Sequence, residues 1–576
     1  MKTTKNIARL AVTAGLTAAL SFGGVMAPVT MAFAADVASA TTNSITINKN
    51  VDNGNVLYKA YQIFKADVVD GKDGSDKVVS NIDWASPAAK TAVLGYLSGV
   101  TDFGITVDSS AQDAAECLIK HSDGTGNATP IENNNLFNGL AKEVEKSVTQ
   151  TGSSFAAGNV FTPQDKDGNA LQGYYLFVTD GSTLGTEEKP VKNTGTSPIF
   201  AVVGDTLVTV SEKTSIPTVE KKIKNDDGSN WADKADSQMG QQVKYKLTGT
   251  VASNIATFGT YHYEFSDKLS GGLTADANSV VVKIGDTVLP CNVTPGVDTG
   301  YDVSIDANNT LTVKFTDLKA AAKQAGATLN GSSNVVVTYT AMLDPVKAAN
   351  VTVGGVGNDN AVKLIYSNNP MGEGTGESVP DTVRDYTYAL KLVKEDAAND
   401  ATKLNGVKFT IQATNPDDNA EGAPAGTKYV QENGTLSENK HEFETKNGGV
   451  IEVKGLDAGT YTVHEVEGSN PGYNTLADFT FTITAEGLGK LEGETLDGNN
   501  DPNTLKVTAK SGDSTMVTPS ADGGTVTLTV KNKKGSNLPL TGLNGVTFTW
   551  IAGGAVLCIG VVHLIRSRKR DEGSEE

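Results

Sequence analysis

Two lysines occupy strand-like runs on the face that should be buried, where a charged side chain is unexpected. Because side chains two residues apart on a β-strand point to the same face, Lys221 shares its face with Val219 and Ile223. Lys394 is in phase with the leucines two and four residues before it. Burying an unpaired ammonium group is costly, so each lysine either reaches water with its charged end or takes part in chemistry.

Each lysine is followed along the chain by a carboxylate and then by an asparagine. Asp267 and Asn360 are both in phase with the apolar residues of their own runs. The same holds for Glu465 and Asn532 near the end of the chain. The sequence therefore contains two sets of lysine, acid and asparagine in the same order.

Such a set can form a covalent bond. Away from water, a lysine favours the neutral amine and a carboxyl group favours the protonated acid. The amine can attack the carboxamide carbon of an asparagine while the acid polarises the carbonyl and relays protons. Ammonia leaves, and the resulting amide restricts the unfolded chain as a disulfide does, although reductants do not cleave it. The alternative is a lysine at a strand edge with its charged end in water.

The elements that must position these residues are mostly strands. Thr, Val, Gly and Asn are abundant, aromatic residues make up 6%, and alternating runs are interrupted by turn residues. Helical patterns are local and lie in the first third of the chain, at residues 87–97, 111–120 and 136–148. We expect a mainly β fold with helical insertions in an N-terminal domain.

The C-terminus carries a processing signal followed by a membrane anchor. The pentapeptide Leu538-Pro539-Leu540-Thr541-Gly542 precedes an apolar run at 546–565 and a basic end at 566–570. About 20 apolar residues suffice for a helix across a bilayer, and the basic end should stay in the cytoplasm. Proline keeps the pentapeptide extended, which suits the groove of a processing enzyme. An ordinary single-pass anchor is the alternative.

The N-terminus predicts secretion. Lys2, Lys5 and Arg9 precede an apolar segment, and the small residues Ala32 and Ala34 mark a cleavage site. This pattern is typical of a signal peptide rather than of a membrane span.

Charge and the remaining motifs exclude several classes of protein. The net charge of −19 argues against nucleic acid or an anionic membrane surface as a partner. The five histidines are scattered outside any nucleophile, zinc or phosphate motif, so we expect no enzyme, cofactor or metal site. Cys117 and Cys291 fall in different predicted domains, and we expect both to be buried and unpaired.

Several segments resemble one family. The stretch at 455–465 with 471–473 resembles the E-box of Cna-B-like domains, and Lys394 with 404–409 resembles their opening. Residues 267–273 and 360–370 are similar to the isopeptide-forming second domain of fimbrial proteins, and 58–64 to their N-terminal domain. With the LPLTG signal, the chain resembles a sortase-assembled major (shaft) pilin of Gram-positive bacteria.

The resemblance implies specific roles. Sortase would cleave between Thr541 and Gly542 and transfer the threonyl carbonyl to a lysine of another copy. Lys213, on the polar face of its run, is the first candidate acceptor and Lys222 the second, although Ser211-Glu212 replaces the Tyr-Pro of the family motif. The implied intramolecular bonds, with their promoting acids, are Lys221–Asn360 with Asp267 and Lys394–Asn532 with Glu465. No comparable set is evident in the first domain.

The resemblance also implies the organisation of the chain as tandem immunoglobulin-like or Cna-type β-sandwich domains. We expect a signal peptide (1–34), an N-terminal pilin domain (35–212), an isopeptide-forming sandwich (213–380), a Cna-B-like sandwich (381–535) and the sorting signal (536–576). The expected partners are sortase, other copies of the chain, minor pilins, peptidoglycan and host surface ligands, with the membrane contacted only through the transient anchor. The alternatives are a monomeric adhesin anchored to the cell wall and a minor basal or tip pilin.

Overall fold

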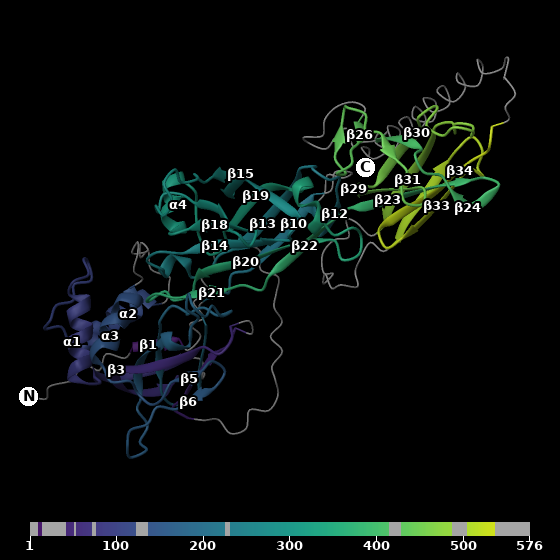
Figure 1. Ribbon diagram of the computed structural model, residues 1–576. Helices are drawn as coiled ribbons and strands as arrows, with labels where there is room; N and C mark the ends of the chain where they lie inside the picture. Colours follow the sequence, from purple (N-terminus) through teal and green to yellow (C-terminus); the bar gives the residue numbers. More distant parts are fainter. Residues whose placement is uncertain are drawn as a thin grey trace, which may run out of the picture.

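The computed structural model describes residues 10–13, 42–50, 53–71, 76–122, 136–212, 214–224, 231–413, 428–486 and 504–535. Lys213, Leu538 to Gly542 and the apolar segment after them lie outside these residues, as does the predicted signal peptide apart from 10–13. None of the helices within the described ranges combines the length and apolar character needed to cross a membrane. Three regions follow one another in a row: N-terminal (10–13 and 42–212), middle (214–386) and C-terminal (387–535) (Figure 1).

The N-terminal region packs helices on one face of a sheet. The sheet has the order β1-β4-β3-β7-β8, with β5 paired to β3, and a smaller sheet has the order β6-β2-β9. Apolar residues of the helices, among them Val93, Leu118 and Leu140, pack against Ile63 and Phe64 of β3. The strands are β1 (Leu10–Thr13), β2 (Ile45–Asn48), β3 (Leu57–Asp70), β4 (Asp76–Trp84), β5 (Phe155–Ala156), β6 (Val160–Phe161), β7 (Gly173–Thr179), β8 (Ile199–Val203) and β9 (Val208–Ser211).

The helices are those the sequence predicted. They are α1 (Pro87–Leu97), α2 (Ala111–Ser122) and α3 (Leu136–Ser147), followed by the short 3-10 helix η1 (Gly181–Thr183). Ser86 caps α1 by accepting a hydrogen bond from the Ala89 backbone N–H, and Pro87 occupies the first turn, where no donor is needed.

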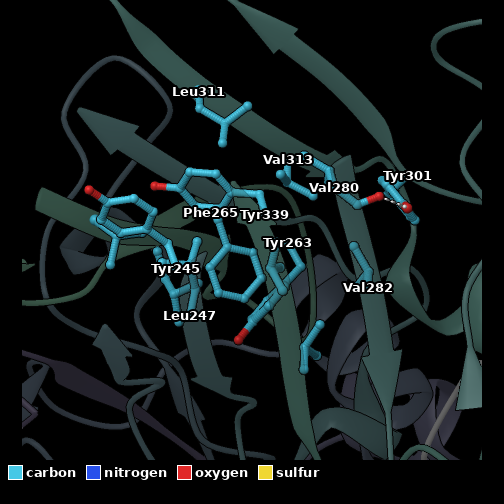
Figure 2. Close-up of a cluster of buried hydrophobic side chains, with 14 of the residues drawn as sticks. Tyr245, Leu247, Tyr263, Phe265, Val280, Val282, Tyr301, Leu311, Val313 and Tyr339 are labelled. Atoms are coloured by element: carbon cyan, nitrogen blue, oxygen red, sulfur yellow. Dashed lines mark hydrogen bonds between the residues drawn. The ribbon is translucent and has the colours of Figure 1, made fainter. Parts of the chain in front are cut away.

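In the described part of the middle region two sheets face each other. One has the order β11-β10-β13-β19-β15-β16, and the other β12-β22-β20-β14-β18-β17 with β21 paired to β20. Tyr245, Leu247 and Tyr339 of the first sheet and Tyr263 and Phe265 of the second point into a common apolar core (Figure 2).

The strands of the middle region are β10 (Val219–Lys224), β11 (Trp231–Ala232), β12 (Lys234–Asp236), β13 (Val243–Thr250), β14 (Tyr263–Leu269), β15 (Leu273–Ile284), β16 (Thr287–Val288), β17 (Asp302–Ile305), β18 (Thr310–Phe315), β19 (Asn334–Leu343), β20 (Asn358–Ser367), β21 (Thr375–Glu377) and β22 (Asp381–Tyr386). The 3-10 helices η2 (Ile255–Thr257) and η3 (Pro345–Asn350) lie between strands. Helix α4 (Leu318–Ala325) begins at the capping Asp317 and ends at Gly326, whose φ of 74° suits glycine.

The described C-terminal region is again a pair of sheets. Their orders are β24-β23-β34-β33, with β29 paired to β23, and β27-β26-β25-β30-β31-β32, with β28 paired to β25. The strands are β23 (Tyr388–Asp396), β24 (Asn399–Lys403), β25 (Lys408–Ala413), β26 (Lys428–Val430), β27 (Leu436–Ser437), β28 (Phe443–Glu444), β29 (Val450–Leu456), β30 (Gly459–Glu465), β31 (Phe479–Glu486), β32 (Thr504–Lys510), β33 (Val517–Asp522) and β34 (Thr525–Asn532). The predicted mainly β fold with N-terminal helical insertions is confirmed.

Polar contacts join the regions to one another. Asn368, at the end of β20, donates from Nδ2 to the Gly185 carbonyl of the N-terminal region at 3.1 Å. The Met239 backbone N–H donates to the Gly455 carbonyl at 2.8 Å, which joins the middle and C-terminal regions. The regions therefore contact through specific bonds and not only through the connecting chain.

One sequence expectation about cysteine is wrong. Cys117 is buried in α2, as predicted, whereas Cys291 is exposed, and both are free thiols. Cys291 lies between the short strand β16 and β17, where its only neighbouring bridge is to Tyr301. Its exposure depends on how distant segments pack around it, so it could not be read from the local sequence.

Candidate functional sites: two buried lysine–acid–asparagine clusters

The middle cluster lies between the two facing sheets of the middle region. Lys221 comes from β10, and Asp267 and Asn360 come from the neighbouring strands β14 and β20 of the opposite sheet. Asp267 is opposite Val362 and Asn360 is opposite Leu269, so the acid and the asparagine are diagonal neighbours on one face. The strand pattern thus brings the three predicted residues into one site.

All three side chains of the middle cluster are completely buried. The Lys221 Nζ donates to Asp267 Oδ1, and it lies 5.5 Å from the ring centroids of both Tyr245 and Tyr339. Burial lowers the pKa of Lys221 to about 8, although the negative charge of Asp267 acts in the opposite direction. The amine is therefore much closer to its neutral, nucleophilic form than an exposed lysine is.

Tyr339 connects the members of the middle cluster. Its hydroxyl donates to Asp267 Oδ2 at 2.7 Å and accepts from Asn360 Nδ2 at 2.7 Å and from Lys221 Nζ at 3.1 Å. Asn360 Oδ1 is buried and has no hydrogen-bond partner among the described residues. Tyr339 was not among the residues predicted from the sequence. Its phase with the buried valines of β19 could have placed it in the core, but nothing in the sequence pointed to a partner.

The C-terminal cluster has the same composition and a more direct geometry. Lys394 on β23 donates to Asn532 Oδ1, and Asn532 on β34 donates from Nδ2 to Glu465 Oε1 at 2.6 Å. Glu465 on β30 also contacts the lysine, with its Oε2 at 3.4 Å from Lys394 Nζ, so each of the three side chains contacts the other two. The three residues are at most 1% exposed. Burial lowers the pKa of Lys394 to about 8, against the opposing effect of the Glu465 charge.

The arrangement of each cluster fits amide formation. A nucleophile, a carboxamide and a carboxyl group lie together, away from water, and the carboxyl group contacts the carboxamide directly in the C-terminal cluster and through the Tyr339 hydroxyl in the middle cluster. In both clusters the lysine and the asparagine come from strands far apart in the chain, and in the C-terminal cluster these two strands are neighbours. A bond at either site would therefore close a long loop.

A buried lysine of the N-terminal region lacks this chemistry. In the N-terminal region, the Lys77 side chain is 3% exposed and donates to Asp70 and to the carbonyl and hydroxyl oxygens of Thr206. Its described partners include no carboxamide. Lys77 therefore has the contacts of a paired structural charge.

The structure describes Lys222 but not Lys213, the two candidate acceptor lysines. Lys213 lies outside the described residues, but both of its neighbours are held. Glu212 accepts from the Tyr58 hydroxyl and from the Asn50 backbone N–H, each at 2.7 Å, and Thr214 is buried. The Lys222 Nζ forms an ion pair with Asp233 at 2.7 Å and lies 3.5 Å from a carboxylate oxygen of Glu220.

These partners raise the pKa of Lys222 despite the opposing effect of burial, because they stabilise its ammonium form. A charged, paired ammonium group is a poor nucleophile.

The chain is similar to known fimbrial proteins. Residues 389–496 match the family described as SpaA prealbumin-like fold domain. The Fimbrial subunit type 1 of Actinomyces viscosus is 25% identical over 380 residues, which are 63% of this chain and 66% of that protein. The chain thus spans just under two thirds of the length of this curated relative.

Solved structures with a similar arrangement include two pilins. The T6 backbone pilin of serotype M6 Streptococcus pyogenes is 16% identical, with 87% of this chain and 100% of that chain covered and a TM-score of 0.49. The full-length major pilin SpaD from Corynebacterium diphtheriae is 17% identical, with 86% and 98% covered and a TM-score of 0.41. The resemblance to Gram-positive pilins that the sequence motifs predicted is confirmed.

Proposed function

We propose that this chain is the major structural subunit of a Gram-positive cell-surface pilus, joined head to tail into a covalent polymer by a sortase. The signal peptide at 1–34 directs export, sortase cleaves between Thr541 and Gly542, and Lys213 of another copy accepts the threonyl carbonyl. The similarity to a fimbrial subunit and to the SpaA domain family supports this proposal. The assembled fibre stays at the cell wall, where it supports adhesion together with minor pilins.

The observation that carries the proposal is the pair of buried clusters. A secreted chain whose described cysteines are free needs another way to resist unfolding, and each cluster is arranged to supply an amide bond. The proposed bonds join Lys221 to Asn360 and Lys394 to Asn532. The chain therefore acts chemically on itself and is a substrate of sortase, not an enzyme acting on other molecules.

The proposed reaction at the C-terminal cluster needs only the residues present. One proton passes from the Lys394 ammonium to Glu465, which leaves a neutral amine beside a neutral acid. The amine attacks Cγ of Asn532, its own proton passes to the carboxyl group, and the acid protonates Nδ2. The C–N bond of the carboxamide then breaks, ammonia leaves and an amide remains.

The order of the residues along the chain explains why two bonds are enough for a fibre under tension. The residues proposed to carry load follow one another as Lys213, Lys221, Asn360, Lys394, Asn532 and Thr541. Tension that enters at the acceptor lysine and leaves at the threonine passes through both crosslinks and bypasses the loops that they close. The N-terminal region precedes the acceptor and lies outside this path, so it needs no crosslink.

Assembly by the matching sortase tests the proposal. The unaltered chain should give a ladder of high-mass products that survives boiling in detergent, because each step adds a covalent bond. Lys213→Ala should abolish the ladder, whereas the matched control Lys222→Ala should retain it. A ladder lost only with Lys222→Ala would identify the other acceptor.

The alternatives predict different products. A single released band that is unaffected by Lys213→Ala would contradict polymerisation and support a monomeric adhesin. Failure of this chain to polymerise alone, with incorporation only at one end of another subunit's polymer, would identify a minor basal or tip pilin.

A further inference from the structure

In both clusters the acid has to link the lysine to the asparagine carboxamide, but the two acids differ in length. In the C-terminal cluster, Glu465 reaches the lysine with one carboxylate oxygen and the asparagine with the other. In the middle cluster, Asp267 is one methylene shorter. The hydroxyl of Tyr339 fills the remaining gap, at 2.7 Å from Asp267 Oδ2 and 2.7 Å from Asn360 Nδ2.

Tyr339 is held firmly in this position. It lies on β19, where it is 2% exposed, and its ring stacks on Tyr245 with centroids 5.2 Å apart and planes inclined by 12°. Figure 2 shows the two rings side by side, with the hydroxyl groups at the same end. Burial and the negative charge of Asp267 raise the pKa of Tyr339 well above its ordinary value, so the hydroxyl keeps its proton at neutral pH.

We propose that Tyr339 is a catalytic residue of the middle cluster, which relays a proton from Asp267 to the leaving nitrogen of Asn360. This inference rests on the amide-forming function proposed above. Asp267 and Tyr339 together perform in the middle cluster the proton transfer that Glu465 performs alone in the C-terminal cluster.

The relay balances in protons and bonds. The reactive state holds Lys221 as the neutral amine and Asp267 as the acid, with its proton on Oδ2. Lys221 Nζ attacks Cγ of Asn360 and gives one proton to Asp267 Oδ1. Oδ2 passes its proton to the Tyr339 oxygen, and the hydroxyl, rotated about its C–O bond, passes its own proton to Nδ2.

The Cγ–Nδ2 bond then breaks and ammonia leaves. Asp267 ends as an acid with its proton on the other oxygen, and Tyr339 ends as a hydroxyl. The products are one amide and one ammonia, and both proton carriers return to their starting charge.

A timed folding experiment tests this role. The mature chain with all three regions is synthesised without sortase, folded for set intervals, quenched in acid and digested, and the Lys221–Asn360 and Lys394–Asn532 peptides are measured by mass spectrometry. In Tyr339→Phe, closure of the middle bond should slow by about 10²-fold or more, the usual contribution of a positioned proton donor. The C-terminal bond of the same molecules should close at the unaltered rate.

Two further variants separate catalysis from folding. Tyr366→Phe removes another buried hydroxyl from the same core, on the strand that carries Asn360, and should leave middle closure unchanged. Asp267→Glu in the Tyr339→Phe background gives the acid the reach that Glu465 has, and it should restore closure in large part. A residue that served only for packing would not be replaced in this way.

The outcomes are distinct. Middle closure at the unaltered rate in Tyr339→Phe, or slow closure that Asp267→Glu fails to restore, would overturn the relay. If neither bond formed in the unaltered chain, the amide-forming function itself would be refuted. Retained C-terminal closure in every variant shows that the C-terminal region has folded, and thermal unfolding of the middle region in Tyr339→Phe and Tyr366→Phe should be alike, which shows that the middle core has folded in both.

Discussion

Lys394 and Asn532 are diagonal neighbours on two parallel strands that are the first and last strands of the C-terminal region. β23 and β34 pair with Lys394 opposite Val530 and Asp396 opposite Asn532. Because parallel neighbours cannot be connected by a tight turn, only non-local contacts hold these strands together. An amide at this point would fix the register of the whole region with a single bond.

The first prediction concerns the acid of this cluster. Glu465→Gln keeps the shape of the side chain but removes its ability to exchange a proton, so the C-terminal bond should not form. The intact mass should rise by about 16 Da relative to the unaltered chain, because about 17 Da of ammonia is retained and the substitution itself removes about 1 Da. The bond spans 138 residues, so its loss should lower the free energy of unfolding by about 5 kcal/mol if the entropy of loop closure dominates.

The exposed Glu467, two residues further along, provides the matched control for this variant. Glu467→Gln should show the mass deficit of two ammonia molecules and unaltered thermal unfolding. A Glu465→Gln chain with the full deficit would contradict the proposed role of the acid.

The second prediction is a pH dependence of stability in a chain that cannot close this bond. In Asn532→Ala, Lys394 stays buried as an amine, with a pKa of about 8 in the folded chain and 10.5 as its ordinary value. Between these values the unfolded chain binds more protons than the folded chain, so the free energy of unfolding should rise with pH. The gain should be on the order of 3 kcal/mol across the window and absent below pH 8.

Denaturant unfolding at pH 7 to 10.5 measures this dependence. Lys394→Met in the Asn532→Ala background removes the titrating group and provides the control, because the other alkaline groups of the chain remain. Parallel pH profiles for the two variants would show that burial does not hold the amine neutral.

Strand periodicity predicted which face of its strand each lysine, acid and asparagine of the two sites occupies. Two-residue phase placed Lys221 and Lys394 on buried faces, and the structure finds both side chains completely buried. Phase also placed the acids and asparagines inward, and the helical patterns at 87–97 and 136–148 matched α1 and α3 closely. These features depend on neighbours along the chain, which the sequence displays directly.

What could not be predicted depends on contacts between distant strands. The phase of its strand could have placed Tyr339 in the core, but its place between Asp267 and Asn360 follows from the packing of one sheet on the other. The exposure of Cys291 likewise depends on which strands cover its segment. The roles of Lys213 and Thr541 remain predictions, since both lie outside the described residues.

The third prediction concerns the junction between the middle and C-terminal regions. Gln238 is buried there, donates from Nε2 to the Gly434 carbonyl, and accepts at Oε1 from the Asp457 backbone N–H at 3.1 Å and the Tyr461 hydroxyl at 3.2 Å. Gln238→Ala removes these bonds, so the two regions should move more freely relative to each other.

Small-angle scattering of the monomer, or the persistence length of assembled fibres, would detect this change. Both crosslinks should still form, because the variant lies outside the two clusters. The matched variant Gln242→Ala removes an exposed glutamine beside the same turn, whose Nε2 contacts Met342 Sδ within the middle region, and it should leave the stiffness close to that of the unaltered chain. Equal stiffness for Gln238→Ala would indicate that the apolar contacts of Met239 with Gly455 suffice to hold the junction.

The fourth prediction is mechanical and follows from the order of the crosslinks along the chain. When assembled fibres are pulled from their ends, tension in the unaltered chain should pass from Lys221 to Asn360 and from Lys394 to Asn532 through covalent bonds. The enclosed loops should not extend. Fibres of Glu465→Gln subunits should instead lengthen in steps, because the 138-residue loop is no longer bypassed. At about 3.5 Å per extended residue, each step should approach 45–50 nm, less the folded distance between its ends. Single-molecule force spectroscopy measures these steps, and steps of this size in unaltered fibres would place the load on a path other than the proposed crosslinks.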